Sequence, residues 1–239
     1  MEFEIIRLIA GEKRYYPTSV DLGILDDGNY IKHDEIDIPL GKSRYGGPII
    51  DLPPDIAHPE GLRFVCQLDL GEISKHDKRD LLPKTGQLII FCDIMTEKGK
   101  IYYANILNED LKRTIVEHED NFWDGVIIEE VKAETEKLED RYRLPEDEEE
   151  EEEFEEYLNE EGKFWDEFTG TDVSKIFGIF THCQWGEEEI KQKISENKTV
   201  LVQFGNNGFN TGGVFSVWID TEDLKHLNFD NCEYHWGQS

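Results

Sequence analysis

The sequence predicts an α+β domain built mostly from antiparallel β-sheet, with a few helices. Four segments have the apolar patterning of strands, and they lie at residues 63–69, 86–93, 199–205 and 213–220. Asn-Gly and Gly-Gly pairs in the connecting segment GNNGFNTGG favour hairpin turns between neighbouring strands. A chain of 239 residues can bury its own core, so we expect residues 1–239 to form one domain.

A repeated pattern predicts an internal duplication of a strand-turn-strand unit. GQLIIFCD, residues 86–93, and GVFSVWID, residues 213–220, both run Gly, x, apolar, x, apolar, aromatic, x, Asp. A strand containing a glutamine precedes each copy, and a turn of the form Ser-basic-x-x-Gly begins each unit. The matched residues are Ser43, Arg44, Gly47 and Gln67 in the unit at 43–93, and Ser174, Lys175, Gly178 and Gln203 in the unit at 174–220. The alternative is two unrelated strand pairs, because short strand patterns recur by chance in β-rich chains.

Alternation assigns the side chains of the first unit to the two faces of its strands. The apolar face of the first strand would carry Phe64, Cys66, Leu68 and Leu70. The opposite face would carry Arg63, Val65, Gln67 and Asp69. In the next strand, Cys92 would share a face with Leu88 and Ile90. Buried structural thiols are the simplest interpretation of such cysteines.

An acidic insertion at about residues 129–161 separates the two units, and it contains 18 acidic and 4 basic residues. Such a run is usually solvated or disordered. Aromatic and apolar residues nevertheless recur at helical spacing from Phe154 to Phe168, which predicts an amphipathic helix. Further helices are expected at 186–198 and, from a Thr221 cap, at 221–227. The tail alternates again and would place Cys232, Tyr234 and Trp236 on one face.

The net charge of −29 limits the partners that the protein can bind through its surface. A surface this negative repels nucleic acids and anionic membranes, and it attracts basic proteins or cations. The N-terminus has acidic residues where a signal peptide would be basic, and no apolar run approaches the roughly 18 residues of a membrane span. Four cysteines without short spacing suit a reducing compartment, so we expect a cytoplasmic protein.

Motifs that would identify an enzyme are missing from the sequence, which favours a binding role. There is no P-loop, no dinucleotide-binding glycine pattern and no G-x-S-x-G motif, so we expect no cofactor and no catalytic residue. A zinc site could be imagined from His182, Cys183, Cys232 and His235. Positions 232 and 235 point to opposite faces of a regular strand, however, so no metal site is expected.

Four polar residues of the repeated pattern are the candidates for a ligand site. Gln67 and Gln203 could line a groove between the units, and Arg44 and Lys175 could contact an anion there. Half-buried amides more commonly bond to the backbone, and in an acidic protein basic residues often pair with carboxylates. The residue pattern fits both interpretations.

The chain resembles the YwqG-like family of uncharacterised bacterial proteins over roughly residues 40–239. The resemblance rests on SRYGGPIIDLP, on LRFVCQLDL with LLPKTGQLIIFCD, on KIFGIF, and on VLVQFGNN with GGVFSVWIDTEDLKHLNFDNCEYHW. It implies an α+β fold and a soluble bacterial protein, but it implies no reaction and no cofactor. Members often end in Trp-Asp-Cys, whereas this chain has Trp236, Gly237 and Gln238, so no role of those terminal residues transfers. Some members look like partners of secreted toxins, which implies an immunity-type role.

Two hypotheses for the function follow. The first is an interaction module that binds a basic protein, such as a toxin or a nuclease, through its acidic surface. Its candidate partner-binding residues are Glu148, Glu149, Glu150, Glu151, Glu152 and Glu153. The second is a small-ligand-binding protein or enzyme with its site between the duplicated units, since ligands favour such junctions.

Overall fold

In the computed structural model, residues 2–21, 28–117, 123–137, 173–179, 192–193, 195–205 and 213–238 are described. Eleven strands of this part of the chain form one sheet, in the order β13-β12-β11-β10-β1-β9-β3-β5-β6-β7, with β2 beside β1. The long strands are β1 (Glu2–Tyr16), β5 (Arg63–Asp69), β6 (Gln87–Asp93), β7 (Lys98–Ala104), β9 (Gly125–Lys137), β11 (Lys198–Phe204), β12 (Gly213–Asp220) and β13 (Glu233–Gln238). The short strands are β2 (Tyr30–Lys32), β3 (Arg44–Tyr45) and β10 (Lys175–Ile176).

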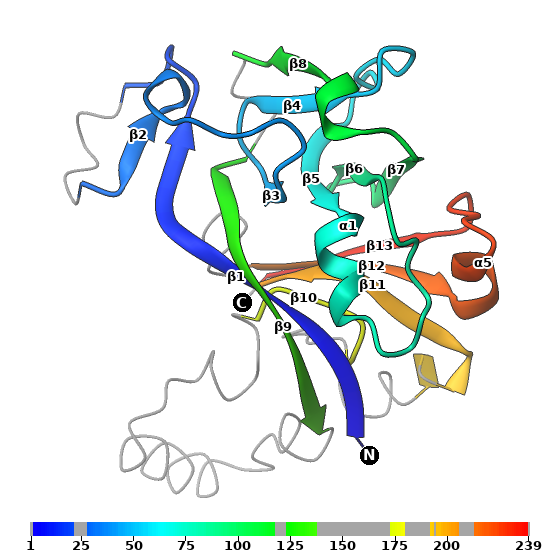
Figure 1. Cartoon of the computed structure of the whole chain (residues 1–239). Coiled ribbons are helices and arrows are strands. Elements are labelled where there is room, and N and C mark those ends of the chain that lie inside the picture. Colours follow the sequence, from blue (N-terminus) through cyan, green and yellow to red (C-terminus); the bar gives the residue numbers. More distant parts are fainter. Residues whose placement is uncertain are drawn as a thin grey trace, which may run out of the picture.

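A separate two-stranded sheet is formed by β4 (Ile49–Leu52) and β8 (Lys112–Ile115) (Figure 1). The α-helices with described bounds are short, namely α1 (Leu70–Ile73) and α5 (Thr221–Lys225), and residues 192, 193 and 195, within the helix expected at 186–198, are also helical. Single 3₁₀ turns occur at η1 (His33–Glu35), η2 (Ser74–His76) and η3 (Asn108–Asp110). Among the described residues, we find no helix with the length and apolar character needed to span a membrane.

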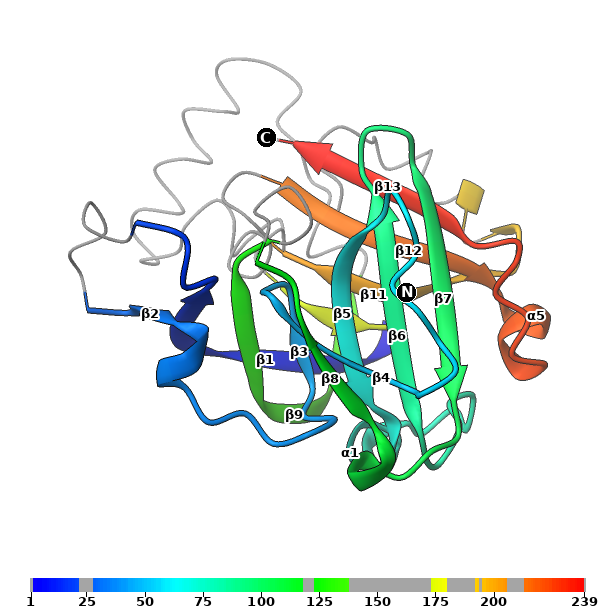
Figure 2. The ribbon, with the colours of Figure 1, turned by 90° about the horizontal axis from the view of Figure 1, so that it is seen from above.

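The expected α+β class is wrong, because the fold is mostly antiparallel β with a nearly closed, barrel-like sheet. The pair of β1 with β2 is parallel, and every other pair in the described part is antiparallel. Figure 2 shows β5, β6 and β7 crossing over β11, β12 and β13, so the sheet folds back on itself. Its two end strands approach one another: Gly99 of β7 packs on the ring of Tyr234 in β13. The sheet therefore covers its own apolar face, which removes the need for helices over that face.

The main core lies inside the nearly closed sheet, and it contains side chains from both ends of the strand order. Leu88 and Ile90 of β6 share one apolar cluster with Phe215 and Val217 of β12. The outer faces of these strands are buried as well, because Ile89 and Phe91 pack with Ile50 of β4 in a second cluster. Burial on both faces explains why β6 and β12 read as nearly continuous apolar runs rather than as strict alternation.

A β-bulge in β5 corrects the predicted faces of the first strand. The register with β6 shifts between Phe64 and Cys66, which reverses the facing of the residues before the bulge. Val65 and Cys66 both pack in the main core, whereas Phe64 lies with Phe91 in the second cluster, on the outer face of the sheet. The predicted sharing of a face by Leu88, Ile90 and Cys92 is confirmed. The same is true of Cys232, Tyr234 and Trp236, which all contact the main core.

The helix caps are set by aspartates that end strands. The Asp69 carboxylate accepts a hydrogen bond from the Gly71 amide at the start of α1, at 2.9 Å. Asp220 caps α5 in the same way through the Glu222 amide at 2.8 Å, so the predicted cap at Thr221 is off by one residue. The helix expected from Phe154 to Phe168 lies outside the described residues.

Candidate functional site

The structure brings the four candidate ligand residues together in two pairs rather than in one groove. Arg44 of β3 lies directly opposite Gln67 of β5, and Lys175 of β10 lies directly opposite Gln203 of β11. The two pairs are separated in the sheet by β1 and β9. All four residues are 0% exposed.

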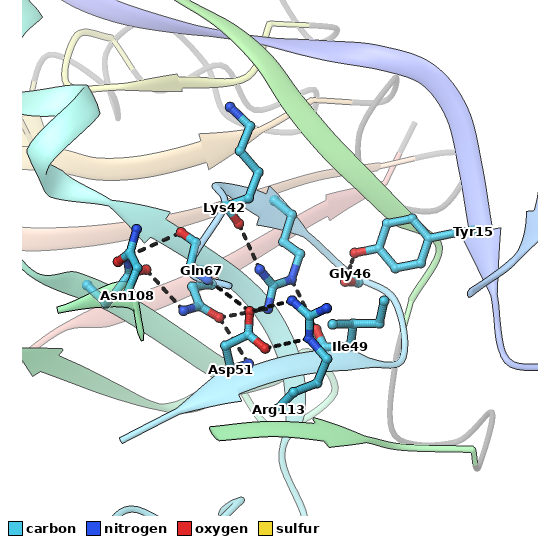
Figure 3. Close-up of polar contacts among 11 residues, drawn as sticks. Tyr15, Lys42, Gly46, Ile49, Asp51, Gln67, Asn108 and Arg113 are labelled. Carbon is cyan, nitrogen blue, oxygen red and sulfur yellow. Dashed lines mark hydrogen bonds and ion pairs between the residues drawn. The ribbon is translucent and has the colours of Figure 1, made fainter. Parts of the chain in front are cut away.

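Arg44 is held by acceptors of its own unit, among them Lys42, Ile49 and Gln67, which Figure 3 labels. Its Nε donates to the Ile49 carbonyl at 3.1 Å and its Nη1 donates to the Lys42 carbonyl at 2.7 Å. Its Nη2 donates to Gln67 Oε1 at 2.8 Å and forms an ion pair with Asp51 Oδ2 at 3.0 Å. The guanidinium charge is thus neutralised inside the protein, which is the condition for burying it.

Asp51, on β4, is the centre of this buried ion network. Its carboxylate accepts from the Gly41 amide at 3.0 Å and from Arg113 at 2.8 and 3.0 Å, in a bidentate pair. Burial raises the pKa of Asp51, but the Arg113 hydrogen bond and the Arg44 charge outweigh it, so the pKa lies below its ordinary value. Arg113 is the exposed end of the network, with 30% of its side chain accessible.

Gln67 extends the network across the outer face of the sheet. Its Oε1 also accepts from the Asp51 amide at 3.2 Å, and its Nε2 donates to Gln87 Oε1 at 3.0 Å. Gln87 Nε2 donates in turn to Asn108 Oδ1 at 2.7 Å, and Asn108 Nδ2 donates to Asp69 Oδ2 at 2.9 Å. The chain of bonds fastens β4, β5, β6 and η3 to one another.

The second pair sits beside a different carboxylate. Lys175 Nζ lies 2.7 and 2.9 Å from the two carboxylate oxygens of Glu136 in β9, and the Lys175 and Glu136 side chains are 0% and 2% exposed. Glu136 also accepts a hydrogen bond from the Ile179 amide. Gln203 Nε2 donates to the Val173 carbonyl at 3.0 Å. In this unit, the basic residue pairs with a carboxylate and the amide bonds to the backbone.

Chemically, both arrangements can hold elements of the fold together. The charged atoms already have partners of opposite charge inside the chain, so an added ligand would have to displace Asp51 or Glu136. Contact of Arg44, Gln67, Lys175 or Gln203 with a ligand stays a prediction.

Sequence reasoning missed Asp51, Arg113 and Glu136, which neutralise the predicted basic residues. The usable signal was the aspartate within IIDL, because a carboxylate inside an apolar strand needs a buried partner. Nothing local indicates that this partner comes from Arg113, 62 residues further along the chain. Glu136 is one of several glutamates in an acidic stretch, and its sequence neighbours do not distinguish it.

The described part of the chain contains no cluster of three or more His, Cys, Asp or Glu side chains suited to a metal ion. Of the four residues considered for zinc, His182 and Cys183 lie outside the described residues. Cys232 contacts the main core, whereas His235 lies opposite Ser216 on the other face. Burial raises the pKa of Cys92 and of Cys232 to about 12, so both thiols are protonated at neutral pH.

The predicted partner-binding residues, Glu148 to Glu153, lie outside the described residues. The acidic stretch that contains them begins inside the fold, because residues 129–137 form the second half of β9. Glu136 belongs to this part and is buried, so the stretch at 129–161 combines a structural segment with residues that the structure does not describe.

Comparison with protein-family models identifies the segment that holds both pairs. A model for a domain of unknown function, DUF1963, matches residues 43–237. The chain belongs to the DUF1963 family. A search of curated proteins found no match.

The DUF1963 match begins at Ser43, immediately before β3, and so leaves β1 and β2 outside. It nevertheless includes β9 and β10, the two strands on either side of β1 in the sheet. A DUF1963 segment taken without residues 1–42 would therefore lack a central strand of this fold.

Proposed function

We propose that the protein is an interaction module that binds a basic partner protein through an acidic surface. The observation that carries this proposal is the net charge of −29, together with the 18 acidic and 4 basic residues between Glu129 and Glu161. Exposed charge of one sign raises the association rate with a partner of opposite charge by long-range attraction.

The partner class follows from the same charge. Enzymes that act on nucleic acids carry positive surfaces that attract phosphate, and a strongly acidic protein can occupy such a surface. A toxin or nuclease is therefore the partner that we propose. The resemblance to YwqG-like proteins supports an immunity-type role of this kind, because some of them look like partners of secreted toxins.

The burial of the four candidate ligand residues also supports binding through the surface. Arg44, Gln67, Lys175 and Gln203 are 0% exposed and engaged within the chain. A small ligand between the two units would have to break the ion pairs with Asp51 and Glu136, and breaking a buried pair costs about 3–5 kcal/mol. A surface partner meets no such cost.

The experiment starts with a pull-down from native cells at low and at high salt, followed by stopped-flow kinetics with the captured protein. We expect the association rate to fall steeply as salt rises, since the Debye length shortens to about 8 Å at 0.15 M ionic strength. The dissociation rate, which depends on packed contacts, should change much less. Association that does not depend on salt would contradict the proposal.

A pair of charge-matched variants locates the surface. The test variant replaces Glu148 to Glu153 with glutamine. The control variant changes six exposed carboxylates elsewhere to amides, at Asp34, Asp37, Asp55, Glu60, Glu97 and Glu109. Both variants change the net charge equally, so a larger loss of association rate in the test variant would assign the effect to the glutamate run. Equal losses would show that the total charge, and not this run, is responsible.

The small-ligand hypothesis predicts the opposite sensitivity to these substitutions. If a ligand binds between the units, substitution of Gln67 or Gln203 should abolish ligand-induced stabilisation, and the glutamate block should have no effect on it.

A further inference from the structure

The two polar pairs belong to a larger correspondence that extends beyond the repeated sequence pattern. We infer that the chain is a fusion of two equivalent modules, formed by β1–β7 and by β9–β13, and that the modules have exchanged their first strands. The strand order supports this arrangement: reading outward from the central pair, β9-β3-β5-β6-β7 on one side matches β1-β10-β11-β12-β13 on the other.

The strand registers of the two modules match residue by residue. Gln67 lies opposite Ile89, which lies opposite Tyr102. In the second module, Gln203 lies opposite Ser216, which lies opposite His235. The same register across three strands is a stronger agreement than similar strand order, because a slip of one residue would reverse the facing of every side chain.

A β-bulge occurs at the same place in both modules. It lies between Phe64 and Cys66 in β5 and between Val200 and Val202 in β11. In each case, the residue after the bulge precedes the matched glutamine by one position. Since a bulge redirects the side chains of its strand, its recurrence preserves the facing of the glutamine.

The turn after the short strand also recurs in its backbone conformation. Gly46 and Gly47 have φ of +60° and +79°, and Phe177 and Gly178 have φ of +66° and +86°. The Gly46 amide donates to the Val65 carbonyl at 2.8 Å, and the Phe177 amide donates to the Val200 carbonyl at 2.9 Å, so both turns bond to the next strand, with acceptors that differ by one position relative to the matched glutamines. A positive φ is uncommon for phenylalanine, so its presence at this position indicates a conformation imposed by the fold.

The serine that begins each turn makes the same hydrogen bond in both modules. The Ser43 hydroxyl accepts from the Asp69 amide at 2.9 Å, two residues after Gln67. The Ser174 hydroxyl accepts from the Gly205 amide at 3.2 Å, two residues after Gln203.

The exchange of first strands follows from the partners of these serines. The Ser43 carbonyl accepts from the Ile128 amide of β9, and the Ser174 carbonyl accepts from the Leu8 amide of β1, both at 2.9 Å. Along the chain, however, β1 precedes the module of Ser43 and β9 precedes the module of Ser174. Each module therefore completes its sheet with the strand that the other module begins with.

The exchange explains the long central pair of the sheet. β1 and β9 run antiparallel to one another from Glu2 opposite Lys137 to Tyr15 opposite Gly125. A twofold axis perpendicular to two equivalent neighbouring strands relates them in antiparallel directions, which is the arrangement of β1 and β9. Without its borrowed strand, each module would expose the edge of β3 or β10, so neither is complete alone.

Elements outside the shared strands have diverged. The β4–β8 sheet covers the outer face of the first module, α1 follows β5, and α5 follows β12 instead of β11. The buried basic residue keeps its place but changes its partner, from Asp51 within the first module to Glu136 on β9.

A circular permutant of the full chain tests the equivalence of the modules. Residues 118–239 would be followed by a flexible linker and then by residues 1–117. If the modules are equivalent, the end of β13 has the same position relative to the start of β1 as the end of β7 has relative to the start of β9. A linker as long as the chain between Ala104 and Gly125 should therefore be able to join the end of β13 to the start of β1. We expect this permutant to melt within about 5 °C of the wild type and to give the same circular dichroism spectrum.

Cleavage of the unpermuted chain provides the second measurement. A protease site inserted in residues 118–122 would separate the modules covalently, and we expect the two fragments to co-elute in native size-exclusion chromatography and to part only in denaturant. Fragments that separate under native conditions would overturn the strand exchange. The permutant should also be made with a linker twice as long. If neither permutant folds although the fragments of the cleaved protein stay associated, the modules are not equivalent.

Discussion

At the scale of single residues, the fold depends on two buried basic side chains and their carboxylate partners. Arg44 and Lys175 are both 0% exposed. Burying either charge would strongly destabilise the folded state without its carboxylate partner, which is Asp51 for Arg44 and Glu136 for Lys175. Such pairs add little net stability over apolar residues of the same volume, but the loss of one partner is strongly destabilising. This asymmetry leads to two predictions.

Substitution of Lys175 by methionine should lower the free energy of unfolding by about 3–5 kcal/mol, because Glu136 would remain buried without its counter-charge. The double variant Lys175→Met with Glu136→Leu removes both charges and should recover a large part of this loss. Urea denaturation of the two variants and the wild type measures the difference. A double variant that is less stable than the single one would show that the pair is not the source of the effect.

Substitution of Asp51 by asparagine should destabilise the protein by about 3–5 kcal/mol at neutral pH, since Arg44 would lose its buried partner. The folded protein holds the pKa of Asp51 below the ordinary value of about 3.9, so the charged carboxylate stabilises the fold above that pH. The difference in unfolding free energy between the wild type and the variant should therefore be constant above about pH 5 and become smaller below about pH 4. Denaturation curves at several pH values test this, with Asp55→Asn at an exposed position as the control that should change stability little.

At the scale of elements, the turn that begins each unit is specified by backbone conformation more than by side chains. Gly178 has φ of +86°, and a methyl group there would collide with the Glu136 carboxylate and the Ile5 side chain. The same glycine thus allows a left-handed backbone and the close approach of the carboxylate that neutralises Lys175.

Substitution of Gly178 by alanine should cost about 2–5 kcal/mol of unfolding free energy, from the left-handed conformation and the overpacking together. Gly61 is the matched control, because it has φ of +74° and no atom within 4 Å of an added methyl group. Gly61→Ala should therefore cost only about 1–2 kcal/mol, the conformational part of the effect. Thermal or urea denaturation compares the two, and equal losses would exclude a packing role for Gly178.

At the scale of the whole molecule, one nearly closed sheet joins both ends of the strand order around a common core. Leu88 of β6 and Phe215 of β12 pack in the same cluster, although they are far apart in the chain. The sheet is also continuous through β1 and β9, which pair with strands on both sides. Neither half can therefore unfold without exposing the core of the other.

We expect a single cooperative unfolding transition as a result. Native-state hydrogen exchange should give the same opening free energy for the slowest amides of β6 and of β12, because both would open only in global unfolding. A markedly lower value in one of these strands would show that the halves unfold separately.

The sequence alone determined the local patterns of this protein. The strands predicted at 63–69, 86–93, 199–205 and 213–220 correspond to β5, β6, β11 and β12, because their apolar patterning depends only on neighbouring residues. The net charge of −29 is likewise a property of composition. The matched Ser-basic turns and glutamines could also be found without coordinates, and the structure places each glutamine opposite its basic residue.

Only the tertiary structure decided which faces of those strands are buried and by what. Gln67 was predicted on the face opposite the apolar one, where it could line a groove, but it is buried and accepts a hydrogen bond from Asp51 of β4, a strand at residues 49–52. The one-residue bulge between Phe64 and Cys66 breaks the strict alternation of side chains between the two faces of β5, and no local sequence pattern predicts it. The fold class was wrong for a related reason, since closure of a sheet depends on pairings between distant strands such as β1 with β9 and β10. Those pairings and the buried partners of Arg44 and Lys175 are contacts between residues far apart in the chain, which patterns of neighbouring residues do not encode.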